Sequence, residues 1–102
     1  MKYSQPRCPL VTYIFSVTVP AQTDEDGVKN ALPVVKRCED FADGLHILFR
    51  ADHFGAYDGI LPVRLIFQIQ EPEESILLKV PAIFSLAASL KLSFINQTYD
   101  TK

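Results

Sequence analysis

The segment GLHILFRADHFGAYDG, residues 44–59, carries the most varied chemistry in the chain. His46 and His53 lie seven positions apart, and Asp52 and Asp58 flank the second histidine. Imidazole and carboxylate groups can bind zinc or iron, and they can also act as an acid–base pair. In an extended strand residues 46 and 52 share one face and residue 53 lies on the other. A loop that folds back could gather Asp52, His53 and Asp58, so a small hydrolase or metal-dependent enzyme centred here is one hypothesis.

Motifs with specific spacing do not support that hypothesis. The sequence has no His-Glu-x-x-His, no paired Cys-x-x-Cys and no Gly-x-Gly phosphate loop. In the acidic stretch TDEDG, Val28 occupies the third calcium-ligand position, so helix capping explains these carboxylates better. Cys38 falls on the apolar stripe of an expected helix, where a thiol packs rather than reacts. We therefore expect no cofactor, no metal and no catalytic residue, and we expect the protein not to be an enzyme.

Length and composition indicate one globular domain, residues 1–102. A chain of 102 residues supports a single core, and 48% hydrophobic residues with 22% charged residues exclude a disordered class. The ten basic residues are scattered and outnumbered by twelve acidic ones, giving a formal charge of −2. Phosphate binding normally needs a clustered basic face, so we expect no nucleic-acid partner, with the pair Lys36 and Arg37 as the one local exception.

The two cysteines and the amino terminus bear on localisation. Cys8 and Cys38 could bridge, but buried thiols in an apolar core are usually reduced, which predicts a cytoplasmic protein. Lys2 and Arg7 precede the run PLVTYIFSVTVPA, as in a secretory leader, yet that run alternates like a strand. No apolar run approaches the roughly 18 residues that span a bilayer, so no membrane partner is expected.

Hydrophobic periodicity and turn residues predict the first elements. A strand is expected over 10–19 and stopped by Pro20, which has no amide hydrogen to donate. Thr23 or Asp24 can cap the helix that follows, and Gly44 suits a left-handed cap at its end. Pro33 lies in the middle of this helix and predicts either a kink or two short helices.

The second half alternates with a period of two. Strands are expected from residue 45 to about 51 and over ILPVRLIFQIQ, with a loop of about six residues between them. The turn EPEES then leads to ILLKV, which suits a third strand of a meander ended by Pro81. Residues 81–96 fit a helix through PAIFSLAASLK and a strand through LKLSFIN, and the pattern leaves this choice open.

These elements predict an α+β fold with a mainly antiparallel sheet of four to five strands and one or two helices; an all-β sandwich is the alternative. The strands carry bulky residues on both faces, which predicts a second apolar layer supplied by a partner. Our first hypothesis is therefore a non-enzymatic protein–protein interaction module (adaptor, inhibitor or assembly subunit), acting through an apolar sheet face or edge as a homodimer. The expected partner-binding residues are Ile14, Leu48, Phe54 and Ile66.

Overall fold

The structure is a computed structural model that describes residues 8–100. Its elements are β1 (Leu10–Pro20), α1 (Asp24–Leu45), β2 (Leu48–His53), β3 (Ile60–Gln70), α2 (Glu73–Ser89) and β4 (Ser93–Asp100). Two helices and one four-stranded antiparallel sheet confirm the α+β fold and rule out the all-β sandwich.

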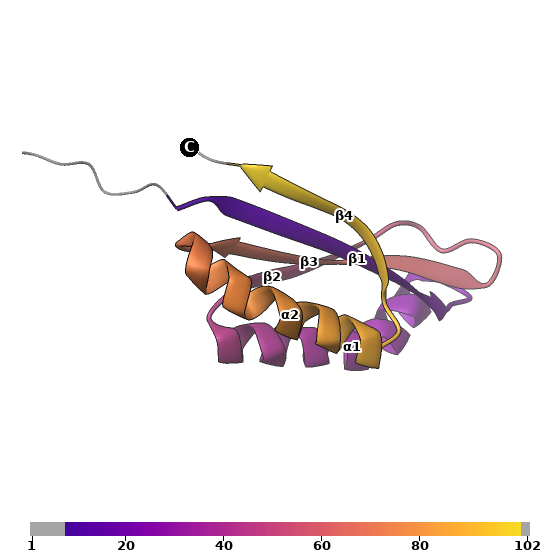
Figure 1. Ribbon diagram of the computed structural model, residues 1–102. Coiled ribbons are helices and arrows are strands. Elements are labelled where there is room, and N and C mark those ends of the chain that lie inside the picture. Colours follow the sequence, from indigo (N-terminus) through magenta and orange to yellow (C-terminus); the bar gives the residue numbers. More distant parts are fainter. Residues whose placement is uncertain (1–7, 101–102) are drawn as a thin grey trace, which may run out of the picture.

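The sheet has the strand order β2-β3-β1-β4, so β1 and β3 are central and β2 and β4 are the two edges. Each neighbouring pair is antiparallel, and the central pair places Ile14 opposite Ile66. This βαββαβ order with interleaved strands is the split βαβ, or ferredoxin-like, arrangement. Both helices cover the same face of the sheet and leave the other face open (Figure 1).

The core lies between that face and the helices. Alternate residues of β1 and β3 point into it, which is the period expected of a sheet covered on one side. Phe15 and Phe67 are its largest fully buried side chains, and their rings meet edge to face at 6.0 Å. The helices contribute mainly small or branched residues: Ala31, Cys38, Ala42, Ile76, Ile83, Leu86 and Ala87.

Helix α1 begins as expected and ends differently. The Thr23 side chain accepts a hydrogen bond from the Asp26 amide at 3.1 Å, which confirms the N-cap. Of the two alternatives at Pro33, two short helices is wrong, because the helix runs continuously for 22 residues. Pro33 is exposed, where water can hydrate the carbonyl it leaves free. The expected cap at Gly44 is also wrong. His46 takes the left-handed conformation instead, with φ 58°.

The stretch ILLKV belongs to α2 rather than to a strand, so the predicted meander is wrong. Ile76, Val80, Ile83 and Ala87 recur at three and four residues and pack on the core, while Pro81 is exposed and lies inside the helix. A short run such as ILLKV, in which four of five residues are apolar, cannot by itself distinguish a buried strand from a helix. Residues 81–96 contain both alternatives, because α2 ends at Ser89 and β4 starts at Ser93.

The close packing of α1 on β3 gives a test of this arrangement. A Cβ added to Gly27 would lie 2.6 Å from the Cβ of Leu61, whereas a Cβ added to Gly44 would meet open space. We expect Gly27→Ala to lower the free energy of unfolding by roughly 1–2 kcal/mol, the cost of overpacking after the gain in helix propensity is subtracted. The matched Gly44→Ala should raise it by up to about 1 kcal/mol. Urea denaturation measures both, and a Gly27→Ala protein as stable as Gly44→Ala would contradict this packing.

Candidate functional site

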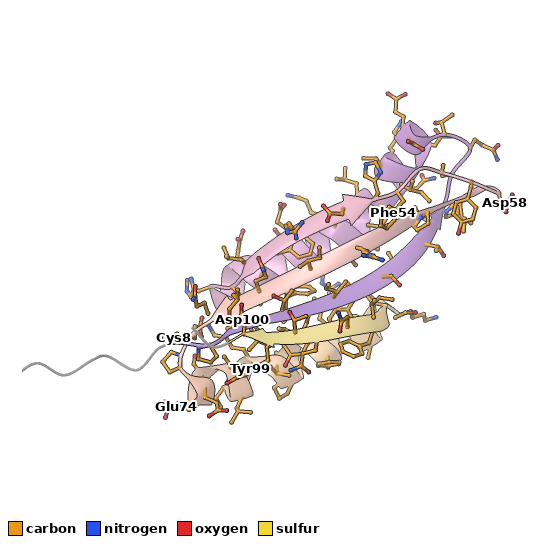
Figure 2. All side chains as sticks on the ribbon, turned by 90° about the horizontal axis from the view of Figure 1, so that it is seen from above. Cys8, Phe54, Asp58, Glu74, Tyr99 and Asp100 are labelled. Atoms are coloured by element: carbon orange, nitrogen blue, oxygen red, sulfur yellow. The ribbon has the colours of Figure 1, made fainter. Side chains whose placement is uncertain are left out.

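The open face of the sheet is mainly polar (Figure 2). At its centre Ile14 lies opposite Ile66 in the register, and Ile66 is only 4% exposed. In the β2–β3 pairing Arg50 lies opposite Ile66, and the aliphatic part of an arginine side chain can cover such an apolar neighbour. The residues that surround this pair are Thr12, Ser16, Asp52, Arg64, Gln68, Asn96 and Thr98. The apolar part of this face is therefore narrow and partly covered, so the open face gives little support to the expected second apolar layer.

The structure brings three of the four expected partner-binding residues together. Ile14, Ile66 and Phe54 line one shallow depression of the open face. Two arginines, Arg50 and Arg64, line the same depression. The Arg64 guanidinium carbon lies 4.9 Å from the centre of the Phe54 ring, a cation–π contact. Leu48 shares the open face at the start of β2 but lies outside this depression, and it is 68% exposed.

The residues of the enzyme hypothesis are not gathered. His46 caps α1 just before β2 and His53 ends β2, so an extended strand separates them by roughly 20 Å. The Asp52 carboxylate accepts a hydrogen bond from Arg50 at 3.0 Å, and Asp58 lies in the following turn with φ 50°. Within residues 8–100 no three His, Cys, Asp or Glu side chains are close enough to hold a metal ion.

An apolar groove lies between α1 and β2, with Val28, Leu32 and Val35 on the helix side and Leu61 and Val63 at its floor. Its volume is about 170 Å³. Sites for small molecules are typically about 300–1,000 Å³ and combine apolar walls with a few convergent polar groups. This groove is smaller and almost entirely apolar, so it is a gap in the packing of an exposed helix flank rather than a built ligand site.

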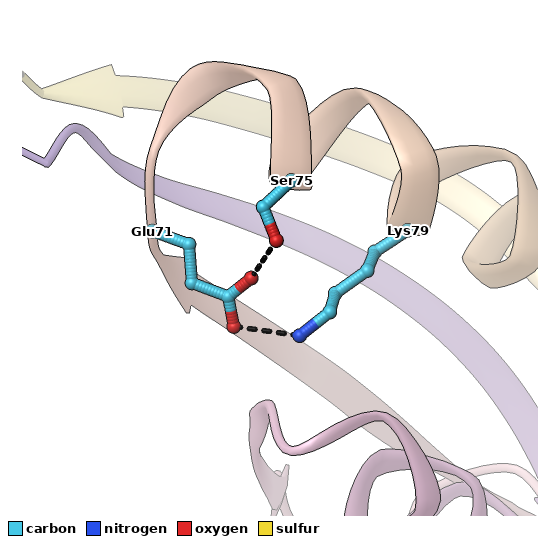
Figure 3. Close-up of polar contacts among 3 residues, drawn as sticks. All are labelled: Glu71, Ser75 and Lys79. Atoms are coloured by element: carbon cyan, nitrogen blue, oxygen red, sulfur yellow. Dashed lines mark hydrogen bonds and ion pairs between the residues drawn. The ribbon is translucent and has the colours of Figure 1, made fainter.

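A polar cluster joins the end of β3 to α2 (Figure 3). One Glu71 oxygen accepts from the Lys79 ammonium at 2.7 Å, and the other accepts from the Ser75 hydroxyl at 2.5 Å. These hydrogen bonds, first from Lys79 and then from Ser75, lower the pKa of Glu71. The carboxylate is fully used by its neighbours, so the cluster anchors the first turns of α2 and leaves no group free for chemistry.

The Glu71 cluster predicts a pH dependence of stability. Because the folded pKa is lowered, its stabilisation is present above the unfolded pKa and is lost as the pH falls through the folded value. We expect Glu71→Gln to cost about 1 kcal/mol of unfolding free energy at pH 7, since charge-assisted hydrogen bonds are the stronger kind. The difference from the unmodified chain should shrink below about pH 4.5.

The matched control for that measurement is Glu39→Gln, which removes an exposed carboxylate on α1 without a recorded side-chain partner within residues 8–100. Urea denaturation from pH 3 to pH 7 should show little change for this control. A constant difference between Glu71→Gln and the unmodified chain over the whole range would contradict the role of the charge.

The thiol of Cys38 is fully buried in the core, and Cys8 and Cys38 are not bridged. Burial raises the pKa of Cys38 to about 11, and the nearby Arg37 opposes this only in part. A nucleophilic cysteine needs a lowered pKa and access to solvent. Cys38 has neither, which agrees with its expected role in packing.

Thiol labelling tests this placement of Cys38. In a Cys8→Ser chain the remaining thiol should react with a disulfide reagent only as the protein unfolds. Burial blocks access, and a pKa two units above its ordinary value reduces the thiolate about 100-fold. The measurement is the rate of labelling in buffer and in 6 M urea. Rapid labelling of native Cys38, at the rate seen in urea, would contradict its position in the core.

The feature that sequence reasoning missed is the outer edge at β4. All eight residues of this strand are exposed, and it pairs with β1 on one side only. Phe94, Ile95 and Tyr99 are 49%, 48% and 52% exposed. The strand contains no lysine and no proline, and its one charged residue is Asp100 at its end. A long, uncharged edge strand of this kind is open to pairing with another chain.

The opposite edge, β2, is built differently. It has six residues, and Arg50, Asp52 and His53 supply charged or titratable side chains along it. Short length and charged side chains are the devices by which natural sheets prevent edge pairing. The two edges of one sheet therefore differ: β2 is short and charged, whereas β4 has only a bulge at Ile95 and one acid at its end.

An apolar flank borders β4 on the helix side. Phe84 of α2 packs against Phe94 with ring centres 5.4 Å apart, and it is itself 37% exposed. Leu77 precedes Phe84 by seven residues, nearly two helical turns, so it lies on the same side of α2; it is 68% exposed. Tyr99 is paired with Val11 on the helix-covered face of the sheet. We call Leu77, Phe84, Phe94 and Tyr99 the β4 flank.

A signal for this edge is present in the sequence. The run SFINQTYD has eight residues of strand character with one charge at its end. Its edge position follows only from the strand order, which periodicity does not report. Comparison with protein-family models, with curated proteins and with solved structures finds no match to this chain. Between residues 8 and 100, neither helix has the length and hydropathy needed to cross a membrane.

Proposed function

We propose that this chain is a non-enzymatic protein–protein interaction module that binds its partner through the β4 edge. The observation that carries the proposal is the contrast between the two edges of one sheet. Evolution of a soluble sheet normally disfavours a long edge strand without charges or proline. Here β2 has charged side chains along its length, whereas β4 has one acid at its end and three half-exposed apolar side chains.

Strand addition is the binding mode that fits such an edge. A partner strand would hydrogen-bond to the outward backbone groups of β4, and its alternate side chains would meet the two sides of the edge. On the helix side those contacts are the β4 flank, which is apolar and aromatic. Aromatic side chains dominate the energetics of protein interfaces, so Phe94 and Tyr99 are the expected anchors. This places the main contact at β4 rather than at Ile14, Leu48, Phe54 and Ile66.

The chemistry of the open face supports a protein partner over a nucleic acid. Four-stranded sheets that bind single-stranded RNA stack bases on aromatic side chains of their central strands. The open-face positions of β1 and β3 carry instead Leu10, Thr12, Ile14, Ser16, Arg64, Ile66 and Gln68. With a net charge of −2, these residues give little attraction for a polyanion. The unbridged Cys8 and Cys38 support the further proposal that the chain works in the cytoplasm.

Site-specific photocrosslinking tests the proposal. Tyr99, which is 52% exposed on β4, is replaced by p-benzoylphenylalanine in the full chain, and the protein is irradiated in an extract of its native cells. We expect an adduct of one discrete mass, and we expect Thr98→Lys in the same chain to reduce it at least about tenfold, because an edge lysine opposes strand pairing. The measurement is immunoblotting followed by mass spectrometry.

The matched control carries the same crosslinker at Leu48, which is 68% exposed at the start of β2. This position should give no discrete adduct. Adducts from position 48 with none from position 99 would contradict the assignment to β4. The absence of adducts at both positions would contradict the proposed function as a whole.

A further inference from the structure

We infer that the partner at the β4 edge is a second copy of this chain, joined by antiparallel β4–β4 pairing centred on Gln97; this inference rests on the proposed function. A partner strand must present apolar side chains on the helix side of the edge and uncharged polar side chains on the open side. Strand β4 itself presents Phe94 and Tyr99, with the amide of Gln97 between them, on the first side and Asn96 and Thr98 on the second.

Symmetry restricts how two β4 strands can pair. A two-fold axis perpendicular to the sheet makes the strands antiparallel and keeps both helix layers on one side. Residues that lie directly opposite each other then share a face. One residue of β4 must therefore lie directly opposite its own copy, with the axis midway between the two. The centre of the strand offers three such positions: Asn96, Gln97 and Thr98.

The side-chain pairs favour Gln97. With the axis there, the two Gln97 amides meet each other, Asn96 faces Thr98, and Ile95 faces Tyr99, each of the last two pairs occurring twice. Moving the axis to Thr98 would set Gln97 against Tyr99. Moving it to Asn96 would set Ile95 against Gln97. Cross-strand pairs of like polarity stabilise a sheet, and only the Gln97 register matches polar with polar and apolar with apolar at all three central positions.

The local geometry agrees with this register. The bulge in the β1–β4 pairing places Ile95 as the extra residue beside Phe94, while residues 96–100 pair regularly. The Gln97 pair and the two Asn96–Thr98 pairs therefore lie in regular strand, and the two Ile95–Tyr99 pairs lie at its boundary with the bulge. Asp100 of one copy lies next to the bulge of the other, roughly 20 Å along the strand from the second Asp100, so the two charges do not oppose each other.

The β4 flank supplies apolar area beyond the backbone pairing. Because both helix layers lie on one side, each copy of α2 borders the same seam, with the exposed Leu77 and Phe84 facing across it. The two four-stranded sheets become one continuous sheet of eight strands with β2 at both outer ends. These outer ends are the charged edges, so the assembly closes as a dimer and does not extend further.

Light scattering on the purified full chain tests the inference. For a chain of 11.5 kDa the measured molar mass should be about 23 kDa, twice the chain mass, at micromolar concentration. Thr98→Lys, which places two lysines beside the axis, should weaken the dimer at least about tenfold. Leu48→Lys adds the same charge on β2 and should leave the dimer unchanged. Circular dichroism of both variants verifies that each is folded.

A disulfide tests the register. In the Cys8→Ser chain, Gln97→Cys places two thiols directly opposite each other, where the Cα atoms of antiparallel partners lie about 4.5–5.5 Å apart, within disulfide range. Asn96→Cys is the control, because its two copies are offset by two residues and lie beyond about 7 Å. Mild oxidation should therefore crosslink the first variant rapidly and the second slowly.

The outcomes separate this inference from the proposed function. A chain that stays at 11.5 kDa up to its solubility limit overturns the homodimer. If position 99 then crosslinks to a different protein, the β4 edge retains its proposed function with another partner. A dimer that withstands Thr98→Lys overturns the β4 interface, and a dimer that is crosslinked through position 96 and not through position 97 overturns the register.

Discussion

The antiparallel pairing of β1 with β3 over eleven residues is the interaction on which the rest of the structure depends. It makes these two strands the centre of the sheet and sets which of their side chains face the helices. Since β2 and β4 each join the outer side of this pair, each βαβ unit must cross over one strand. Crossovers of this kind are right-handed almost without exception, which places both helices on the same face. One covered face, one open face and two free edges follow from that single pairing.

Most of the buried apolar side chains lie on the covered face. The open face also buries an apolar side chain, Ile66, without the second layer that we expected. Ile66 is buried without a second layer of secondary structure, because neighbouring strands and long polar side chains surround it. An apolar residue on an open sheet face therefore does not by itself require a partner. Part of the apolar surface that stays exposed lies on the β4 flank, where Leu77, Phe94 and Tyr99 are about half-exposed or more.

The titratable residues have structural roles in this fold. The ion pair of Glu71 and Lys79 joins α2 to the end of β3. Arg50 and Asp52 place charges on the β2 edge, where they oppose pairing with another strand. His46 serves as the left-handed end of α1, a backbone role rather than a chemical one. The side chains that could do chemistry are thus distributed over capping, anchoring and edge protection. Within residues 8–100 the edge at β4 has none of these roles, and that is the basis for assigning function to it.

The sequence by itself favoured the α+β class over a sandwich and indicated β1, a cap of α1 at Thr23 or Asp24, β3 and the burial of Cys38. Each of these depends on local periodicity or on one side chain bonding to its own backbone. The sequence could not determine α2 or the edges. Four of the five residues 76–80 are apolar, and only the core behind Ile76, Ile83 and Leu86 selects the helix. The exposure of Phe94 and Tyr99 depends on strand order, a long-range property that arises when β4 pairs with β1, whose partner residues lie 77 to 90 positions earlier in the chain.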